Sequence, residues 1–201
     1  MRNPIEKWLK EHREMLTHAD RMVELLAPDD IQTRLSKPDE MKLRHEIADC
    51  VEKIGVIIDP HIEAERMILF PMISDHFGRI SGTCVDTLSC LGREHEQLGL
   101  FFDRAKSLLP SLKNPEPLEK SVSAELLRVC YGIHTVLTYH CPKEETEVYS
   151  LVGKLPLKSI SKLAQEIGLD EDIEIDHLIK PLGEDKGSMG PDWSEREAPD
   201  N

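Results

Sequence analysis

Apolar residues recur at steps of three and four along most of the chain, the spacing of one face of an α-helix. The first stripe lies in residues 4–27, with Pro4 suited to a helix start and Ala27-Pro28 to its end. The members of the stripe are Ile5, Leu9, His12, Leu16, Ala19, Val23 and Leu26. A histidine therefore lies on a face that is otherwise apolar.

Three further stripes follow, and each also contains a histidine. They are bounded by Pro38 and Phe70-Pro71, by Ser81 and Pro110, and by a Pro-rich loop at residues 111–117 and Leu151. Pro60 and Pro142 fall inside two of these patterns, where an internal proline is expected to kink the helix. A shorter helix is predicted around residues 157–167.

Long helices joined by short loops predict an all-α, up-down-up-down four-helix bundle, followed by the short fifth helix and an acidic C-terminal tail. We expect the bundle to occupy residues 1–155 and a helical extension residues 156–182. Residues 183–201 are acidic, rich in Gly and Pro and nearly free of aliphatic residues, so we expect them to be disordered.

Composition narrows the possible partners. Residues 169–201 contain 11 acidic and 3 basic residues, so this segment accounts for −8 of the net charge of −13. The absence of a basic run argues against a nucleic-acid partner, and the absence of long apolar runs argues against a membrane segment.

The five cysteines form no C-x-x-C motif, which favours free thiols and a cytoplasmic location. The acidic tail is expected to aid solubility or to bind a protein partner.

A His/Glu pair occurs twice in the chain. His61 and Glu65 are four residues apart, as are His140 and Glu144, and this spacing stacks two side chains on one helix face. His12 precedes the first pair by 49 residues, and His95 precedes the second by 45. The chain thus contains two copies of one helix pair. This repeated pattern predicts a two-metal site that the two copies share.

A single histidine on an apolar stripe is more often a hydrogen-bonded core residue than a metal ligand. Two buried glutamates, each one turn after a buried histidine, are harder to explain without a cation, because an unpaired carboxylate in a core is costly. The histidines outside the repeated pattern are interpreted as surface or structural residues: His18, His45, His76, His134 and His177.

The chemistry of these ligands narrows the choice of metal. No thiolate belongs to the set, since Cys141 points about 100° around the helix from His140. Imidazoles combined with bridging carboxylates suit iron or manganese, and a structural zinc site more often contains cysteines. We therefore predict two non-haem iron ions, ahead of manganese or zinc. Each ion would have two histidines, with bridging carboxylates between ions about 3.5–4 Å apart.

The order His, His-xxx-Glu, His, His-xxx-Glu resembles the hemerythrin-like (HHE cation-binding) family, as does the segment from Glu65 to Pro71. The resemblance covers roughly residues 5–152 and implies a four-helix bundle with a di-iron centre. It implies four terminal ligands and two bridges, namely His12, His61, His95, His140, Glu65 and Glu144. The ferritin-like di-iron fold fits less well, because its Glu-x-x-His motif occurs only once, in the polar tail.

Two positions depart from the oxygen-carrying members of this family. Those proteins have a further histidine one turn after the ligand on the third helix, where this chain has Gly99. They also have an Asp five residues after the last histidine, where Glu145 stands here. Gly92 and Gly99 flank His95 on its own helix face, so they leave room either for an open coordination position or for close helix packing.

The resemblance leaves the function open. A binding protein would take up O2 or NO for sensing, scavenging or storage. An enzyme would detoxify NO or peroxide or take part in iron–sulfur cluster repair, and an iron-handling protein would carry the metal as cargo. No catalytic residue can be assigned from the sequence.

Overall fold

The computed structural model describes residues 4–27, 29–35, 37, 40–78 and 82–168, and this part of the chain contains helices and no strands. Four long helices form the body of the molecule: α1 (Pro4–Leu26), α3 (Met41–Ala64), α5 (Gly82–Lys113) and α6 (Lys120–Glu144). Shorter helices join or extend them: α2 (Ile31–Leu35), α4 (Phe70–Phe77), α7 (Ser150–Val152) and α8 (Leu157–Glu166).

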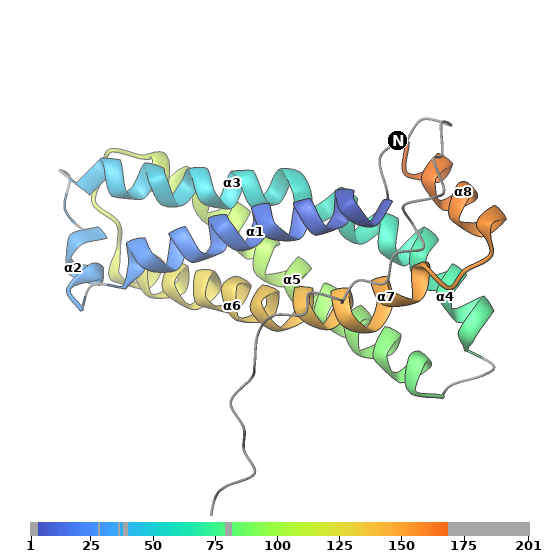
Figure 1. Cartoon of the computed structure of the whole chain (residues 1–201). Helices are drawn as coiled ribbons and strands as arrows, with labels where there is room; N and C mark the ends of the chain where they lie inside the picture. Colours follow the sequence, from blue (N-terminus) through green and yellow to red (C-terminus); the bar gives the residue numbers. More distant parts are fainter. Residues whose placement is uncertain (1–3, 28, 36, 38–39, 79–81, 169–201) are drawn as a thin grey trace, which may run out of the picture.

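The four long helices lie side by side as an antiparallel bundle (Figure 1). Helix α1 packs against α3 and α6, and α5 packs against the same two helices, so the four long helices form a closed ring in which each contacts two others. Short connections between long amphipathic helices favour this arrangement. The predicted up-down-up-down bundle is confirmed.

The apolar interior is divided into two clusters along the bundle. The larger one fills the half that contains Met15, Ile58 and Leu137. The smaller one contains Trp8, Leu69 and other residues near the opposite end, and α8 covers it with Ile160 and Leu163. In each stripe, the histidine lies between residues of the larger cluster on one side and residues of the smaller cluster on the other. The fold therefore places these polar side chains between two apolar layers.

Two five-residue π-helical segments interrupt the long helices. Segment η2 (Glu65–Leu69) follows α3, and η3 (Glu145–Tyr149) follows α6. In η2 the backbone hydrogen bonds span five residues instead of the four of an α-helix, since the N–H of Phe70 donates to the carbonyl of Glu65. A π-turn adds one residue, which rotates the following helix relative to its earlier face, and such turns are frequent at functional sites.

This rotation corrects two details of the predicted stripes. Beyond Glu65 the buried face continues through Leu69 rather than Ile68, and the helix does not end at Phe70-Pro71 but continues as α4 to Phe77. Pro71 lies in the first turn of α4, directly after the widened backbone hydrogen-bond ladder of η2.

Three further details of the prediction differ from the structure: the end of the third long helix, the buried face of α1, and the presence of α2. Helix α5 continues past Pro110 to Lys113, and Leu112 in its last turn is fully buried. Along α1 the deeply buried positions include Trp8, Met15 and Met22, whereas Leu9, Leu16 and Val23 are only partly buried. The short helix α2 was not predicted. Residues 169–201, including the predicted tail and much of the predicted extension, lie outside the described residues.

Candidate metal centre

The six predicted side chains converge at the centre of the bundle. Two groups of four residues each place one nitrogen or oxygen per residue within 4.8 Å of one another. The first group is His12, His61, Glu65 and Glu144, and the second is His95, His140, Glu65 and Glu144. Both glutamates belong to both groups. All six side chains are buried, with the two glutamates at 0% exposure.

The histidines form two pairs whose Nε2 atoms face each other. The Nε2 atoms of His12 and His61 are 3.0 Å apart, and those of His95 and His140 are also 3.0 Å apart. One pair joins α1 with α3, and the other joins α5 with α6. Each half of the repeated sequence therefore supplies one pair.

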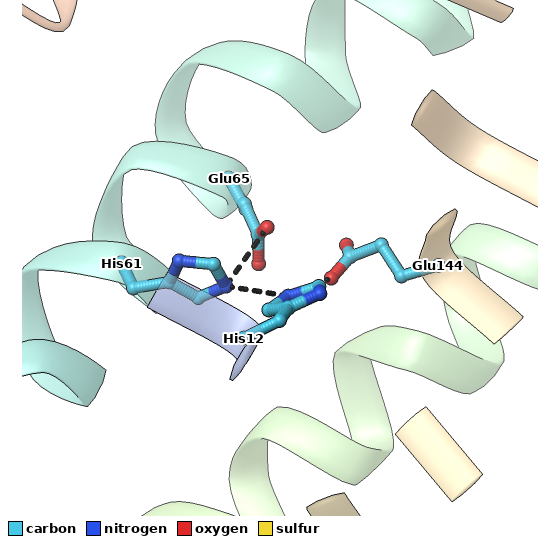
Figure 2. Close-up of side chains that lie close together, drawn as sticks. All are labelled: His12, His61, Glu65 and Glu144. Carbon is cyan, nitrogen blue, oxygen red and sulfur yellow. Dashed lines mark hydrogen bonds and ion pairs between the residues drawn. The ribbon is translucent and has the colours of Figure 1, made fainter. Parts of the chain in front are cut away.

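The two glutamates lie between the histidine pairs. The two oxygens of Glu65 are 3.1 Å from His61 Nε2 and 3.3 Å from His95 Nε2. Glu144 Oε2 is 3.5 Å from His12 Nε2 and 3.4 Å from His140 Nε2. Figure 2 shows the first group, with both carboxylates directed toward the imidazoles. Each glutamate thus contacts one histidine from each pair.

In the described part of the chain, three of the four oxygens of these carboxylates lack a hydrogen bond, and the fourth, Oε1 of Glu65, accepts one from Tyr149. Among the described residues, neither oxygen of Glu144 has a hydrogen-bond partner, and neither does Oε2 of Glu65. An uncompensated buried carboxylate costs several kcal/mol or shifts its pKa. A cation between the glutamates and the imidazoles would remove that penalty. The donor set of this structure therefore fits metal ions.

Acidic side chains support three of the four histidines from behind. The Nδ1 atoms of His12, His61 and His140 lie 3.0 Å from Glu145, 2.8 Å from Glu11 and 3.0 Å from Glu94, respectively. A carboxylate at this nitrogen fixes the ring and leaves Nε2 free to bind metal. Lys7 pairs with Glu11, and Lys143 pairs with Glu94. The two halves of the site thus share a Lys–Glu–His arrangement that the sequence interpretation missed.

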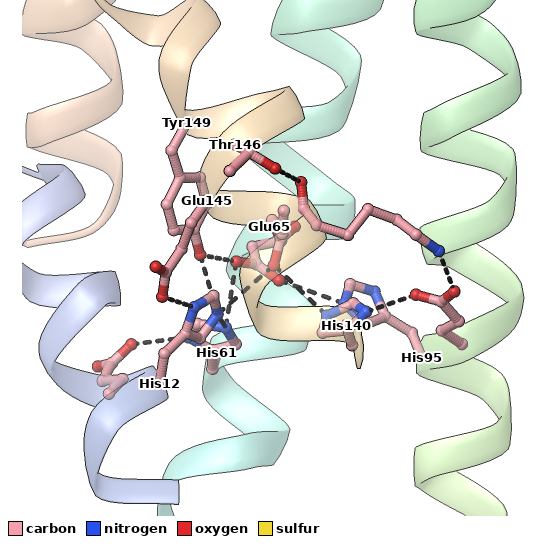
Figure 3. Close-up of polar contacts among 12 residues, drawn as sticks. His12, His61, Glu65, His95, His140, Glu145, Thr146 and Tyr149 are labelled. Carbon is pink, nitrogen blue, oxygen red and sulfur yellow. Dashed lines mark hydrogen bonds and ion pairs between the residues drawn. The ribbon is translucent and has the colours of Figure 1, made fainter. Parts of the chain in front are cut away.

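Tyr149 is a further member of the site that the sequence interpretation missed. Its hydroxyl donates to Glu65 and lies 3.2 Å from His12 Nε2 (Figure 3). Its ring stacks on Trp8, with ring centroids 5.6 Å apart, and on His12. An α-helical repeat would not place residue 149 on the face of Glu144, but the π-turn of η3 does.

Burial and charge shift the pKa values of these groups in the metal-free protein. Burial opposes the charging of His61, but Glu65 and Glu11 outweigh it and raise the pKa of His61 to about 10. Burial likewise opposes the charged form of Glu65, while His61 and His95 lower its pKa well below the usual value. For Tyr149, burial and the charges of Glu65 and Glu144 raise the pKa, so the phenol keeps its proton.

We expect the metal-free protein to be most stable in mildly acidic solution. The raised pKa of His61 contributes stability that is complete below its unfolded value of 6.5 and is lost as the pH rises toward about 10. The lowered pKa of Glu65 contributes stability above 4.5 that is lost as the pH falls through its folded value. Urea unfolding of metal-free protein at several pH values should show falling stability above pH 6.5, and less of this loss in His61→Gln.

A metal-loaded protein should lose its metal in mildly acidic solution, where we expect the metal-free protein to be most stable. Protons compete with the metal for the imidazoles, so metal should be released as the pH falls through roughly 6 to 4. Dialysis at fixed pH followed by elemental analysis measures this release. A metal content that stays constant at pH 4, together with metal-free stability that rises from pH 6.5 to 9, would contradict the assignment of these histidines to the site.

The remaining candidates lie outside the cluster. His134 is 2.9 Å from Asp20 in a partly exposed ion pair, and His45 and His76 are exposed. His177 lies outside the described residues. All five cysteines are free, and Cys141 is buried in the larger apolar cluster, where burial raises the pKa of its thiol. The predicted exclusion of Cys141 from the ligand groups agrees with this placement.

The fold and the site define a helical-bundle protein with buried His/Glu groups suited to binding metal cations. The model of the hemerythrin HHE cation-binding domain family matches residues 3–152. The chain therefore belongs to the hemerythrin HHE cation-binding family, in agreement with the resemblance drawn from its sequence. Comparisons with curated proteins and with solved structures gave no match. None of the described helices combines the length and apolar content needed to cross a bilayer.

Proposed function

We propose that the chain is a non-haem di-iron protein that binds a small diatomic ligand, O2 or NO, for sensing, scavenging or storage. The observation that carries this proposal is the sharing of both buried glutamates by two histidine pairs. A single ion needs one such group, whereas two groups with common carboxylates suit two neighbouring ions. His12 and His61 would hold one ion, His95 and His140 the other, and Glu65 and Glu144 would bridge them.

The donor atoms support iron as the metal. Both groups combine imidazole nitrogens with carboxylate oxygens, and neither contains a thiolate. This mixture suits iron or manganese better than a structural zinc ion. When bound, a pair of iron ions supplies electrons that can be exchanged with a diatomic ligand. The chain would contribute an enclosed site, since all six side chains are buried.

Tyr149 gives a specific reason to consider an enzyme as the second candidate. Its phenol keeps its proton, because burial and nearby carboxylates raise its pKa, and its hydroxyl lies among the candidate ligands. A proton donor at this place can stabilise negative charge on a bound ligand without transferring the proton. It can also give the proton up during the reduction of NO or peroxide. In either proposed function, the Tyr149 hydroxyl would act on the bound ligand.

Anaerobic loading with Fe(II), followed by O2 and separately by NO, tests the proposal. Optical and Mössbauer spectra should show a ligand complex that persists and is reversed when the gas is removed. Repeated consumption of NO or peroxide would support the enzyme instead. Loss of the iron on exposure to either gas would indicate that the metal is cargo, and would contradict the binding function.

We expect Tyr149→Phe to weaken ligand retention without reducing iron content. In the proposed complex the Tyr149 hydroxyl, which donates to Glu65 in this structure, would donate to the bound ligand instead. A hydrogen bond to a charged group contributes about 1.5–3 kcal/mol, so its loss should shorten the lifetime of the complex at least about tenfold. Tyr139→Phe is the control, because Tyr139 is 71% exposed. The measurement is the rate of ligand loss at equal iron content. Equal rates in both variants would show that the Tyr149 hydroxyl has no role in ligand binding.

A further inference from the structure

A pocket of about 430 Å³ opens beside the candidate metal centre. Its walls come from the end of α3, from η2 and from α5, and they include Ile62, Met67 and Gly99. His95 also lines the pocket, although this side chain is only 2% exposed. The pocket therefore extends from the surface of the bundle to one of the candidate ligands.

Gly99 lines this pocket and borders open space. A Cβ built at Gly99 would meet no atom within 4 Å in the described part of the neighbouring helices, and the same is true at Gly92. Neither glycine is thus required for close helix packing. Only Gly99 lines the pocket, one helical turn beyond His95.

His95 is also the one histidine of the site whose Nδ1 atom is not held by a carboxylate of the described residues. The other three histidines have a carboxylate at Nδ1, whereas Nδ1 of His95 has no hydrogen-bond partner among the described residues. The ring of His95 is instead stacked on Phe70, with centroids 5.5 Å apart. A histidine without a carboxylate behind it is a weaker base and holds its metal less firmly. The two histidine pairs are therefore not equivalent.

Carboxylates predominate among the charged residues of the pocket. Asp59, Glu63 and Glu96 line it, against one positive residue, Arg66. Asp59 forms a salt bridge with Lys106, but within the described residues Glu63 and Glu96 form none. An excess of negative charge around an opening raises the local concentration of cations.

We propose that this pocket is the route by which divalent cations reach the metal centre, and that the His95–His140 pair receives them. The inference rests on the proposed two-metal function and adds to it a direction of metal uptake. It follows that the ion held by His95 and His140 exchanges faster than the ion held by His12 and His61. Acidic side chains attract the cation at the surface, and His95 is the first buried ligand that it meets.

Cobalt uptake by the metal-free protein tests the route, since Co(II) bound by imidazole and carboxylate absorbs visible light. Gly99→Leu should fill the pocket and slow uptake by on the order of tenfold, because the metal must then wait for local opening of the bundle. The final content should remain two ions per chain. Gly92→Leu is the matched control on the same helix and should take up cobalt at the wild-type rate. Wild-type uptake by Gly99→Leu, or equal slowing in both variants, would overturn the proposal.

A charge at the opening provides a second test that does not disturb the interior. Met67 lines the pocket and is 72% exposed, so Met67→Lys should fold normally. Its added positive charge should slow uptake about twofold to fivefold at low ionic strength and little at high salt. Val56→Lys is the control, because Val56 is 77% exposed and does not line the pocket. Equal rates for the two lysine variants at low salt would contradict cation uptake by this route.

These outcomes are separable from those of the proposed function. Cobalt uptake rates do not depend on whether the iron form binds O2 or NO. A protein that takes up two cobalt ions through the pocket but forms no ligand complex would retain the route and lose the proposed function. A protein that forms the complex but whose uptake is unaffected by Gly99→Leu would lose the route alone.

Discussion

Replacing Glu65 by alanine should remove most of the metal from the protein. Glu65 is the residue whose two oxygens reach different histidine pairs, at 3.1 Å from His61 Nε2 and 3.3 Å from His95 Nε2. Without it, each candidate ion would lose a ligand, and the two ions would lose one of their bridges. We expect the iron content at equilibrium to fall from two ions per chain to well below one.

Glu63→Ala is the matched control for this substitution. Glu63 lies two residues earlier on the same helix, is exposed, and belongs to neither ligand group. Its iron content at equilibrium should equal that of the wild type, even if uptake is slower. Glu144→Ala should behave like Glu65→Ala, since its Oε2 contacts both histidine pairs. Equal iron contents in Glu65→Ala and Glu63→Ala would show that Glu65 is not a ligand.

Gly99→His should convert an accessible position beside His95 into an occupied one. The new side chain meets no neighbouring helix at its Cβ, and it extends into a pocket that His95 also lines. An imidazole one turn after His95 can bind the same ion, so azide would compete with it for the open position. Azide affinity at the iron site should fall about tenfold, equivalent to about 1.4 kcal/mol.

Gly92→His provides the comparison for Gly99→His. Gly92 also stands on α5 without a close neighbour, but it does not line the pocket. Both substitutions should favour the helix by a few tenths of a kcal/mol, since glycine is the poorer helix former. Azide titration monitored by optical absorption distinguishes them. An unchanged azide affinity in a folded, two-iron Gly99→His protein would rule out an open position at this site.

The bundle and the convergence of the six side chains could be predicted because both depend on regular helix geometry. A period of 3.6 residues places His61 and Glu65 on one face, and the repeat places His140 and Glu144 in a matching position. Short connections then bring the four helices together. The structure adds that both glutamates lie between the two histidine pairs, an arrangement that the spacing implied and the distances now describe.

The surroundings of the site depend on departures from that regular geometry. The π-turn of η3 begins at Glu145, which reaches His12, and ends at Tyr149, whose hydroxyl reaches Glu65. No residue pattern in the chain predicted the π-turns. Pro60 and Pro142 lie shortly before them and indicated only that the helices are irregular there. Glu11 and Glu94 were missed for another reason. Each acts on a histidine of a neighbouring helix, and such pairings appear only after packing.

We expect the two histidine pairs to hold two iron ions bridged by Glu65 and Glu144. Iron determination combined with Mössbauer spectroscopy, on protein prepared under iron-replete conditions, tests it most directly. We expect two iron ions per chain, with spectra of a magnetically coupled pair. One zinc ion per chain and no iron, or isolated single iron ions without coupling, would contradict it.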